Sequence, residues 1–352
     1  MSRKISGFIG LVLILIFIQI IFPKPFDSSI PGEKTGQIIN LRKTGEIGES
    51  FSKEENGYFW RISDICCDRK GNLYVADSGW NRITKFNSSR EAVLSFGRAG
   101  QGPGEFLSDP GSTSLKISCG NDEKIYATDP SNARVAVFAE DGKYLRAMPL
   151  KIRYDRAVAN AGGDVYLLGK DLPQAICCFG VDLKQKACFL DRSTHFRFPL
   201  EKPKNKIVAA ELSDQDLQKR ITRKDELVVL SNYALKVFIF GRENKLAKEF
   251  AIKETGLLDD IKTRLIDILR KSERGFLDPF SLILDQSDNL CLLYFNRKAG
   301  RNEMYRYSLE GRLLDISVFP ERINMIGCIA NDGRIYAVMK ADKIGIFEIK
   351  NF

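Results

Sequence analysis

The fold is decided by the stretch DRKGNLYVAD at residues 68–77. A polar turn that contains a glycine leads into an alternating strand, as a half-buried antiparallel sheet requires. Further strands follow several copies of this pattern, joined at Asp141-Gly142 and Glu310-Gly311, which are typical hairpin turns. The other five copies of the pattern are at residues 121–129, 162–168, 224–230, 287–293 and 332–338.

Four strands in each of six copies predict an all-β fold, a six-bladed β-propeller with four-stranded blades. Such a ring needs a closing device, because an open ring leaves two unpaired strand edges. The last copy reaches Phe352 without a fourth strand, and residues 37–41 have the length and the alternation to supply one. We therefore expect this N-terminal strand to close the last blade.

Two intervals between the copies are longer than one blade needs, and they carry predicted helices. Apolar residues recur at helical spacing over residues 257–269, which predicts a helical insertion between blades 4 and 5. A shorter helix is predicted from Glu211 to Arg220. We expect these helices to pack on their own blades, and the binding of a partner is the alternative.

The N-terminal region predicts export. Residues 1–4 are basic at two positions, and residues 5–22 are almost uniformly apolar. A helix of this length spans about 27 Å, close to the roughly 30 Å of bilayer hydrocarbon, and the basic residues favour a cytoplasmic N-terminus. The apolar run ends in bulky residues at 19–23, where a signal peptidase needs small ones. A cleaved signal and a secreted propeller are the alternative. The expected segments are a cytoplasmic segment at 1–4, a signal-anchor transmembrane helix at 5–22, a linker at 23–36 and a periplasmic or extracytoplasmic propeller at 37–352.

The composition limits the chemistry of the chain. It has 54 basic and 45 acidic residues, a net charge of +9, with the two signs interspersed. We therefore expect no nucleic-acid partner. The single histidine, His195, excludes a site built on two histidines. No catalytic set, metal site or cofactor is predicted.

The eight cysteines leave three interpretations open. An even number in an exported chain is compatible with disulfides. Most of them lie in apolar strands, where cysteine acts as a small hydrophobic residue. Adjacent Cys66 and Cys67 point to opposite faces of a strand, so they cannot bind one metal ion together. Free buried thiols are the preferred interpretation, ahead of disulfides and of a metal site.

The stretch FGRAGQGPGEF at residues 96–106 resembles the inter-blade linker of NHL-repeat propellers. In that family a Tyr-Val-Ala-Asp strand and an Asn-x-Arg-Ile segment accompany the linker. Similar segments here are YVAD at 74–77 with Arg82, and YATD at 126–129 with Arg134. The match is specific over residues 59–150 and faint beyond them. The whole chain resembles bacterial exported six-bladed propellers of the TolB-like superfamily, many of which lack an assigned activity.

The resemblance singles out two pairs of an acidic and a basic residue, and the glycines of the linker. Asp77 and Arg82, like Asp129 and Arg134, are five residues apart across a tight turn. We expect each carboxylate to cap its turn and to pair with the guanidinium, and ligand binding at the channel mouth is the alternative. The glycines predict a flexible blade linker, since no Lys-Ser/Thr follows as in a phosphate loop. They are Gly97, Gly100, Gly102 and Gly104.

The leading functional hypothesis is a membrane-anchored, non-catalytic binding module that presents its propeller face to a protein, peptide or glycan. The alternative is a divergent hydrolase or lyase with an acidic metal site in the central channel. Amidating lyases of the NHL type hold zinc through several histidines, which one histidine cannot supply. RNA binding is disfavoured by export and by the mixed charge pattern.

Overall fold

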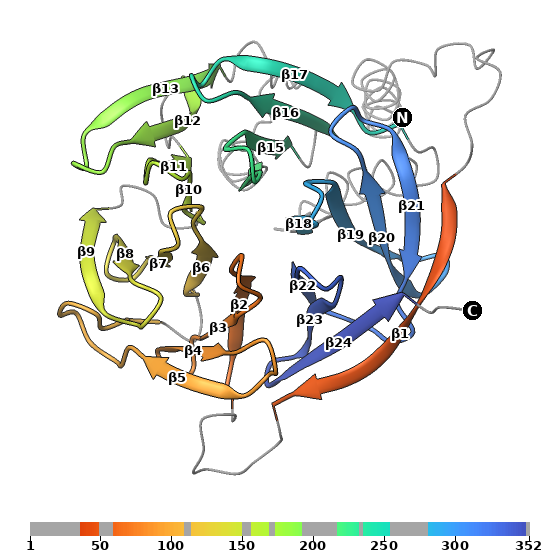
Figure 1. Cartoon of the computed structure of the whole chain (residues 1–352), viewed down its shortest axis with the longest axis horizontal. Helices are drawn as coiled ribbons and strands as arrows, with labels where there is room; N and C mark the ends of the chain where they lie inside the picture. The colour runs from red at the N-terminus through yellow and green to blue at the C-terminus, as the bar shows by residue number, and fades with distance from the viewer. Residues whose placement is uncertain are drawn as a thin grey trace, which may run out of the picture.

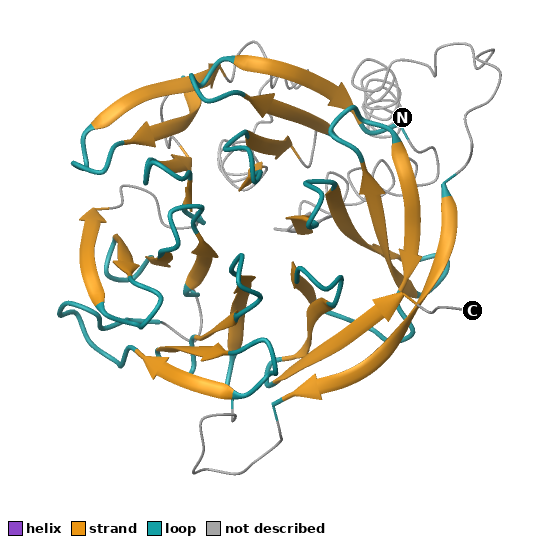
Figure 2. Ribbon diagram, viewed as in Figure 1, coloured by secondary structure: helices purple, strands orange, loops and turns teal. Residues whose placement is uncertain are grey.

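The computed structural model describes residues 36–48, 59–108, 114–149, 156–168, 173–191, 217–231, 235–253 and 281–349. These residues form strands joined by loops and turns, and they contain no helix (Figure 2). In particular, the described part of the chain has no helix with the length and apolar character that crossing a membrane requires. The sheets are arranged radially around a central axis, as in a β-propeller (Figure 1).

Four separate antiparallel sheets have four strands each. The first consists of β2 (Ile62–Cys67), β3 (Leu73–Asp77), β4 (Arg82–Phe86) and β5 (Ala92–Phe96). The second consists of β6 (Lys116–Cys119), β7 (Ile125–Asp129), β8 (Arg134–Phe138) and β9 (Tyr144–Pro149). The third consists of β10 (Val158–Ala159), β11 (Val165–Leu168), β12 (Gln174–Phe179) and β13 (Gln185–Asp191). The fourth consists of β14 (Leu217–Ile221), β15 (Leu227–Ser231), β16 (Lys236–Phe240) and β17 (Leu246–Ala251).

The other strands form one eight-stranded sheet, in the order β18-β19-β20-β21-β1-β24-β23-β22. Its members are β1 (Gln37–Ile47), β18 (Ser281–Leu284), β19 (Leu290–Asn296), β20 (Arg301–Tyr307), β21 (Leu313–Val318), β22 (Met325–Ile329), β23 (Ile335–Lys340) and β24 (Lys343–Ile349). The strand β1 joins two arms of this sheet, β18–β21 and β22–β24, which are neighbours in the ring (Figure 1). The first half of β1 pairs parallel to β21, and the second half pairs antiparallel to β24.

The prediction of six separate four-stranded blades is therefore wrong. The described residues form four such blades, and the remaining strands merge into one sheet. The reason is the length of β1, which at 11 residues extends well beyond the expected segment 37–41. Most of that segment pairs with β21, and the residues from Leu41 to Ile47 lie along β24. A strand has two hydrogen-bonding edges, so one long strand can pair with both arms.

The predicted helices are not found in the described residues. The helix predicted from Glu211 to Arg220 is wrong where it can be compared, because Leu217–Ile221 is the strand β14. Burial alternates over the first four residues of this strand, and the charged Lys219 is buried. The other helical segments, 5–22 and 257–269, lie outside the described residues. His195, the predicted segment 1–4 and residues 23–35 of the predicted linker 23–36 lie outside them as well.

The hydrophobic core lies between neighbouring sheets. One cluster combines Tyr74 and Ile83 of the first sheet with Ile117 and Phe138 of the second. The strands β3 and β7 are buried along their whole length, because each of their faces contacts an adjacent sheet. Burial of this kind contributes about 1.5–3 kcal/mol for each large apolar side chain. No sheet buries its faces alone, so the ring is stabilised as a unit.

Candidate functional site

A cavity lies on the axis of the ring. The innermost strands contact one another in the order β2, β6, β10, β14, β18, β22, and β22 in turn contacts β2. In Figure 1 these strands surround the centre of the molecule. Residues from all of them line a cavity of about 160 Å³. This volume suits a small ligand or the end of a larger one.

Hairpin turns meet over one end of this cavity. Arg69, in the turn after β2, donates a hydrogen bond to the carbonyl of Arg223, in the turn after β14, at 3.1 Å. Arg223 donates to the side chain of Asn331, which donates to the carbonyl of Arg69. Asn121, in the turn after β6, donates to Asp225 at 2.7 Å. Turns from four sectors of the ring are thus tied together across the axis.

Three charged side chains occupy the wall of the cavity or lie beside it. Asp64 of β2 is fully buried, and its Oδ2 accepts a hydrogen bond from the Ile117 amide at 2.9 Å. Its Oδ1 forms an ion pair with Arg156. Arg220 of β14 also lines the cavity, and no carboxylate of the described residues forms an ion pair with it. Among the residues that the structure describes, two guanidinium groups therefore face one carboxylate, an excess of one positive charge.

The environment of Arg220 is unfavourable for its charge. Burial, followed by the charge of Arg156, lowers the pKa of the Arg220 guanidinium. A guanidinium nevertheless remains protonated in proteins. Its Nη1 donates to the carbonyl of Lys219 at 2.7 Å. A partly buried cation beside a second cation is stabilised by an anion from outside the protein.

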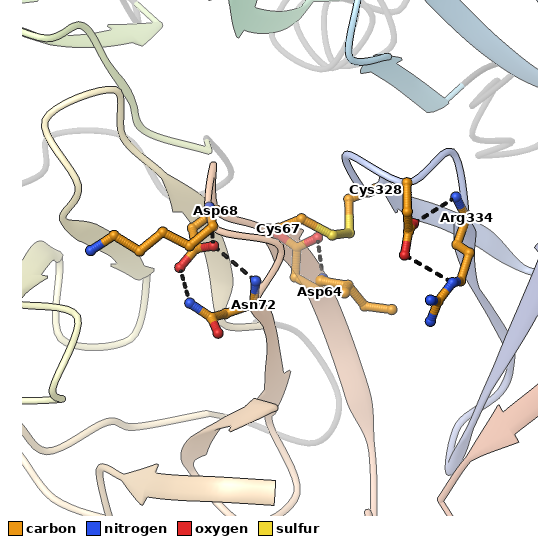
Figure 3. Close-up of a disulfide and its surroundings, with 9 residues drawn as sticks. Asp64, Cys67, Asp68, Asn72, Cys328 and Arg334 are labelled. Atoms are coloured by element: carbon orange, nitrogen blue, oxygen red, sulfur yellow. Dashed lines mark hydrogen bonds and ion pairs between the residues drawn. A yellow bond between two sulfur atoms is a disulfide. The ribbon is translucent and has the colours of Figure 1, made fainter. Parts of the chain in front are cut away.

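Cysteines line the same cavity. Cys67 of β2 and Cys328 of β22 form a disulfide with their Cα atoms 5.9 Å apart (Figure 3). Cys66 of β2 and Cys119 of β6 are free thiols in the cavity wall. The preferred interpretation, free thiols throughout, is therefore wrong for half of the cysteines. The chain has two disulfides and four free thiols; the second disulfide is Cys177–Cys188, and the other free thiols are Cys178 and Cys291.

The motif residue Asp77 lies at the end of β3, directly opposite Arg82 in the β3–β4 register. Its buried carboxylate accepts hydrogen bonds from four backbone amides. Trp60 and Arg61 donate at 2.8 and 2.9 Å. Gly79 and Trp80 donate at 2.9 and 3.2 Å. Asp77 thus caps its own turn and also holds the segment that leads into β2.

The second motif pair, Asp129 and Arg134, forms an ion pair at 3.7 Å on the corresponding turn of the second sheet. Asp129 is buried, and burial raises the pKa of its carboxyl. Arg134 uses its Nη2 to donate to the carbonyls of Gly102 and Glu105, at 2.8 and 2.7 Å. The guanidinium therefore fastens the blade linker to the sheet, and both motif pairs lie away from the residues that line the cavity.

The linker glycines form a hydrogen-bonded loop. Gly97, Gly100 and Gly104 have positive φ angles of 91°, 152° and 76°. The amide of Gly102 donates to Glu105 Oε2 at 2.8 Å. This hydrogen bond, followed by one from Arg98, lowers the pKa of the Glu105 carboxyl. The loop is held by its own side chains, and nothing in its geometry provides a phosphate site.

An exposed aromatic pair was not anticipated from the sequence. Trp60 and Trp80 are the two tryptophans of the chain, and they are 57% and 45% exposed. Their rings meet edge to face with centroids 5.6 Å apart. Asp77 binds the backbone amides of both residues, so the pair is held in place. Trp80 lies between the motif residues Asp77 and Arg82, whereas Trp60 lies eight positions before the stretch 68–77, so no local signal in the sequence pairs the two.

The cavity charges were also missed by the sequence reasoning. Arg156 and Arg220 belong to no motif, and Asp64 precedes the first recognised copy. They come together because Asp64 and Arg220 lie on the innermost strands β2 and β14 and Arg156 lies just before the innermost strand β10. The structure offers no support for an acidic metal site, because within the described ranges no group of three or more His, Cys, Asp or Glu residues could hold a metal ion.

Comparison with known proteins shows similarity in fold. No protein-family model matches the sequence, and no curated protein matches it. A putative exported protein from Bacteroides fragilis is similar with a TM-score of 0.56 and 13% identity, over 90% of this chain and 100% of that one. A member of the DUF4221 family from Bacteroides vulgatus has a TM-score of 0.55 and 11% identity, over 90% and 100%.

Virginiamycin B lyase from Staphylococcus aureus has a TM-score of 0.49 and 14% identity, over 88% of this chain and 100% of that one. At such low identity these likenesses concern the fold and not the activity. Membership of the NHL-repeat or TolB-like group stays a prediction. What the comparisons establish is that this chain has the fold of a β-propeller protein.

Proposed function

We propose that the chain is an exported, non-catalytic binding module whose axial cavity accepts an anionic group. The single observation that carries this proposal is the pair Arg156 and Arg220 in the cavity with Asp64 as their one described acidic neighbour. Planar guanidinium groups bind carboxylate, phosphate and sulfate through paired, charge-assisted hydrogen bonds.

The state of Arg220 supports this function. Its charge is partly removed from water and repelled by Arg156. An incoming anion would relieve both costs, because attraction between opposite charges strengthens as water is excluded. The cavity of about 160 Å³ limits the bound part to a small group. The partner is therefore a small anion or the acidic end of a peptide, protein or glycan.

Two observations support export. The disulfides Cys67–Cys328 and Cys177–Cys188 are of the kind that persists in oxidising compartments. One structural neighbour is described as a putative exported protein. Alkaline phosphatase fused after residue 352 would be active only outside the cytoplasm, because it needs disulfides to fold. Activity of that fusion is the expected result, with residues 5–22 as the predicted membrane anchor.

The binding function is tested by calorimetric titration of the full chain in mild detergent. The titrants are inorganic phosphate, sulfate and citrate, with glucose as the neutral control. We expect one saturable site for at least one anion and weaker binding as the salt concentration rises. Arg220→Gln should weaken it about 10- to 100-fold, since hydrogen bonds to charged groups contribute about 1.5–3 kcal/mol.

The matched control is Arg242→Gln, at an exposed arginine in the turn after β16, and it should bind like the wild type. Titration with two forms of one peptide, one with a free and one with an amidated C-terminus, tests whether the bound anion is the carboxylate of a chain end. Equal binding of the two forms would point instead to a free small anion. Absence of saturable binding to all anions, or equal affinity of Arg220→Gln and the wild type, would refute the proposal.

A further inference from the structure

The two free thiols in the cavity wall lie at the same level on adjacent strands. The amide of Ile117 on β6 donates to Asp64 on β2, and these residues are 53 positions apart. Lys116 donates to the carbonyl of Ser63 across the same separation of 53. Both are side-chain contacts between neighbouring sheets, and Cys119 follows Cys66 by the same interval of 53, so the register of these contacts places the two cysteines at the same level.

Direct contact between the thiols agrees with this register. Cys66 and Cys119 both line the cavity and both pack against the core cluster between the first two sheets. Their thiols are within hydrogen-bonding contact of each other. Both cysteines are partly exposed as residues and line the cavity, so a small reagent in the cavity has access to the pair.

The neighbouring residue shows that a disulfide fits between innermost strands. Successive side chains of a strand point to opposite faces, so Cys66 points towards β6 when Cys67 points towards β22. Cys67 is already bonded to Cys328 on β22. A second bond from Cys66 to Cys119 would be the corresponding link on the other side of β2.

We propose that Cys66 and Cys119 form a redox-active dithiol, which a small-molecule disulfide oxidises to a third disulfide joining β2 to β6. One thiolate of the pair attacks the small disulfide, forms a mixed disulfide with one of its sulfur atoms and releases the first small thiol. The second thiolate then attacks the protein sulfur of that mixed disulfide and releases the second small thiol. The two protons of the protein thiols end on the two small thiols, so atoms and electrons balance.

The exchange should be slow at neutral pH. Burial, followed by the hydrogen bond from Cys66, raises the pKa of the Cys119 thiol. Only a thiolate attacks or displaces sulfur, so the rate of ring closure should rise as the solution becomes alkaline. The oxidation is independent of the proposed anion binding and holds whether or not the cavity accepts an anion.

The test is peptide mapping of the full chain after incubation with oxidised glutathione at about pH 8.5, alkylation in denaturant and non-reducing trypsin digestion. Trypsin releases Cys66 and Cys67 in residues 62–69, Cys119 in residues 117–124 and Cys328 in residues 323–334. We expect one species that contains all three peptides. Untreated protein should give peptides 62–69 and 323–334 joined, and alkylated 117–124 alone.

The controls separate a specific pair from general oxidation. Cys178 and Cys291 should keep full alkylation in the same sample, and Cys178→Ser should still give the three-peptide species. Cys66→Ser should abolish it while leaving Cys67 bonded to Cys328. The proposal would be overturned if Cys66 and Cys119 were still alkylated after treatment with oxidised glutathione. A stable mixed disulfide of glutathione with either cysteine in the wild type would overturn it as well.

Discussion

Replacing Asp77 by alanine should destabilise the first blade more than any change to an exposed carboxylate. The substitution removes one buried side chain that accepts four backbone hydrogen bonds, from Trp60, Arg61, Gly79 and Trp80. These donors come from two separate segments, the one before β2 and the turn after β3. Both segments lose their common attachment at once.

The magnitude follows from those four contacts. A hydrogen bond to a charged group contributes about 1.5–3 kcal/mol, and the value falls when water can replace the lost acceptor. Trp60 and Trp80 are 57% and 45% exposed, so water can reach their side of the site. About 1 kcal/mol for each of the four gives a loss of about 3–5 kcal/mol in the free energy of unfolding.

The assay is urea denaturation followed by tryptophan fluorescence. The chain has two tryptophans, Trp60 and Trp80, and Asp77 binds the amides of both. Emission therefore reports on this site directly. The Asp77→Ala protein should unfold at a lower urea concentration, and its folded state should lose the near-ultraviolet circular dichroism of the paired rings.

The matched control is Asp332→Ala. Asp332 also caps a hairpin turn, through the amide of Arg334 at 3.1 Å, but it is exposed. Its removal should cost less than about 1 kcal/mol. Coincident urea midpoints for the Asp77 and Asp332 variants would refute the assignment of Asp77 as the residue that holds the two segments.

Two further predictions concern the blade linker. Gly97→Ala should lower the free energy of unfolding by about 2–4 kcal/mol, since φ is positive and the added Cβ would overlap the ring of Phe106. The control Gly333→Ala has a similar φ but no atom near the added Cβ, so it should cost only the backbone strain of about 1–2 kcal/mol. Equal urea midpoints for the two variants would contradict this prediction. Glu105→Gln should lower the free energy of unfolding at neutral pH. The pKa of the Glu105 carboxyl is lowered in the folded protein, so its ionised form stabilises the fold above the ordinary pKa of 4.5, and this stabilisation is lost as the pH falls below that value. The difference in the free energy of unfolding between the wild type and Glu105→Gln should therefore become smaller at about pH 3. A difference that does not change with pH would show that ionised Glu105 is not its source.

The strands were predictable because their signals are local. The stretch at residues 68–77 contains its own turn, and the turn and the strand both appear where expected, although β3 is buried along its whole length and not on one face only. The pairing of β1 was predicted only in outline, because register depends on partners near the other end of the chain. Residues 217–220 were misassigned as part of a helix from Glu211 to Arg220, and they belong to the strand β14. In the structure the charges of Lys219 and Arg220 belong to an innermost strand beside the cavity.

The candidate site could not be predicted from motifs. Asp64 and Arg220 belong to two different sheets and Arg156 precedes a third, and each is unremarkable in its own sequence context. The cysteines show the same limit: the opposite directions of Cys66 and Cys67 followed from strand geometry, but their neighbours on β6 and β22 did not. Proximity around an axis is a property of the ring and not of any single repeat.

The pairing of β1 also determines when the molecule can be completed. β1 is the first described strand to be synthesised, yet its partners β21 and β24 are among the last. Until translation has supplied them, both of its edges lack native partners and can pair with a strand of another copy. Ring closure is therefore a late folding event that requires β21 and β24. A nascent chain stalled before β21 would retain an N-terminal strand with unpaired edges, which chaperones would have to cover.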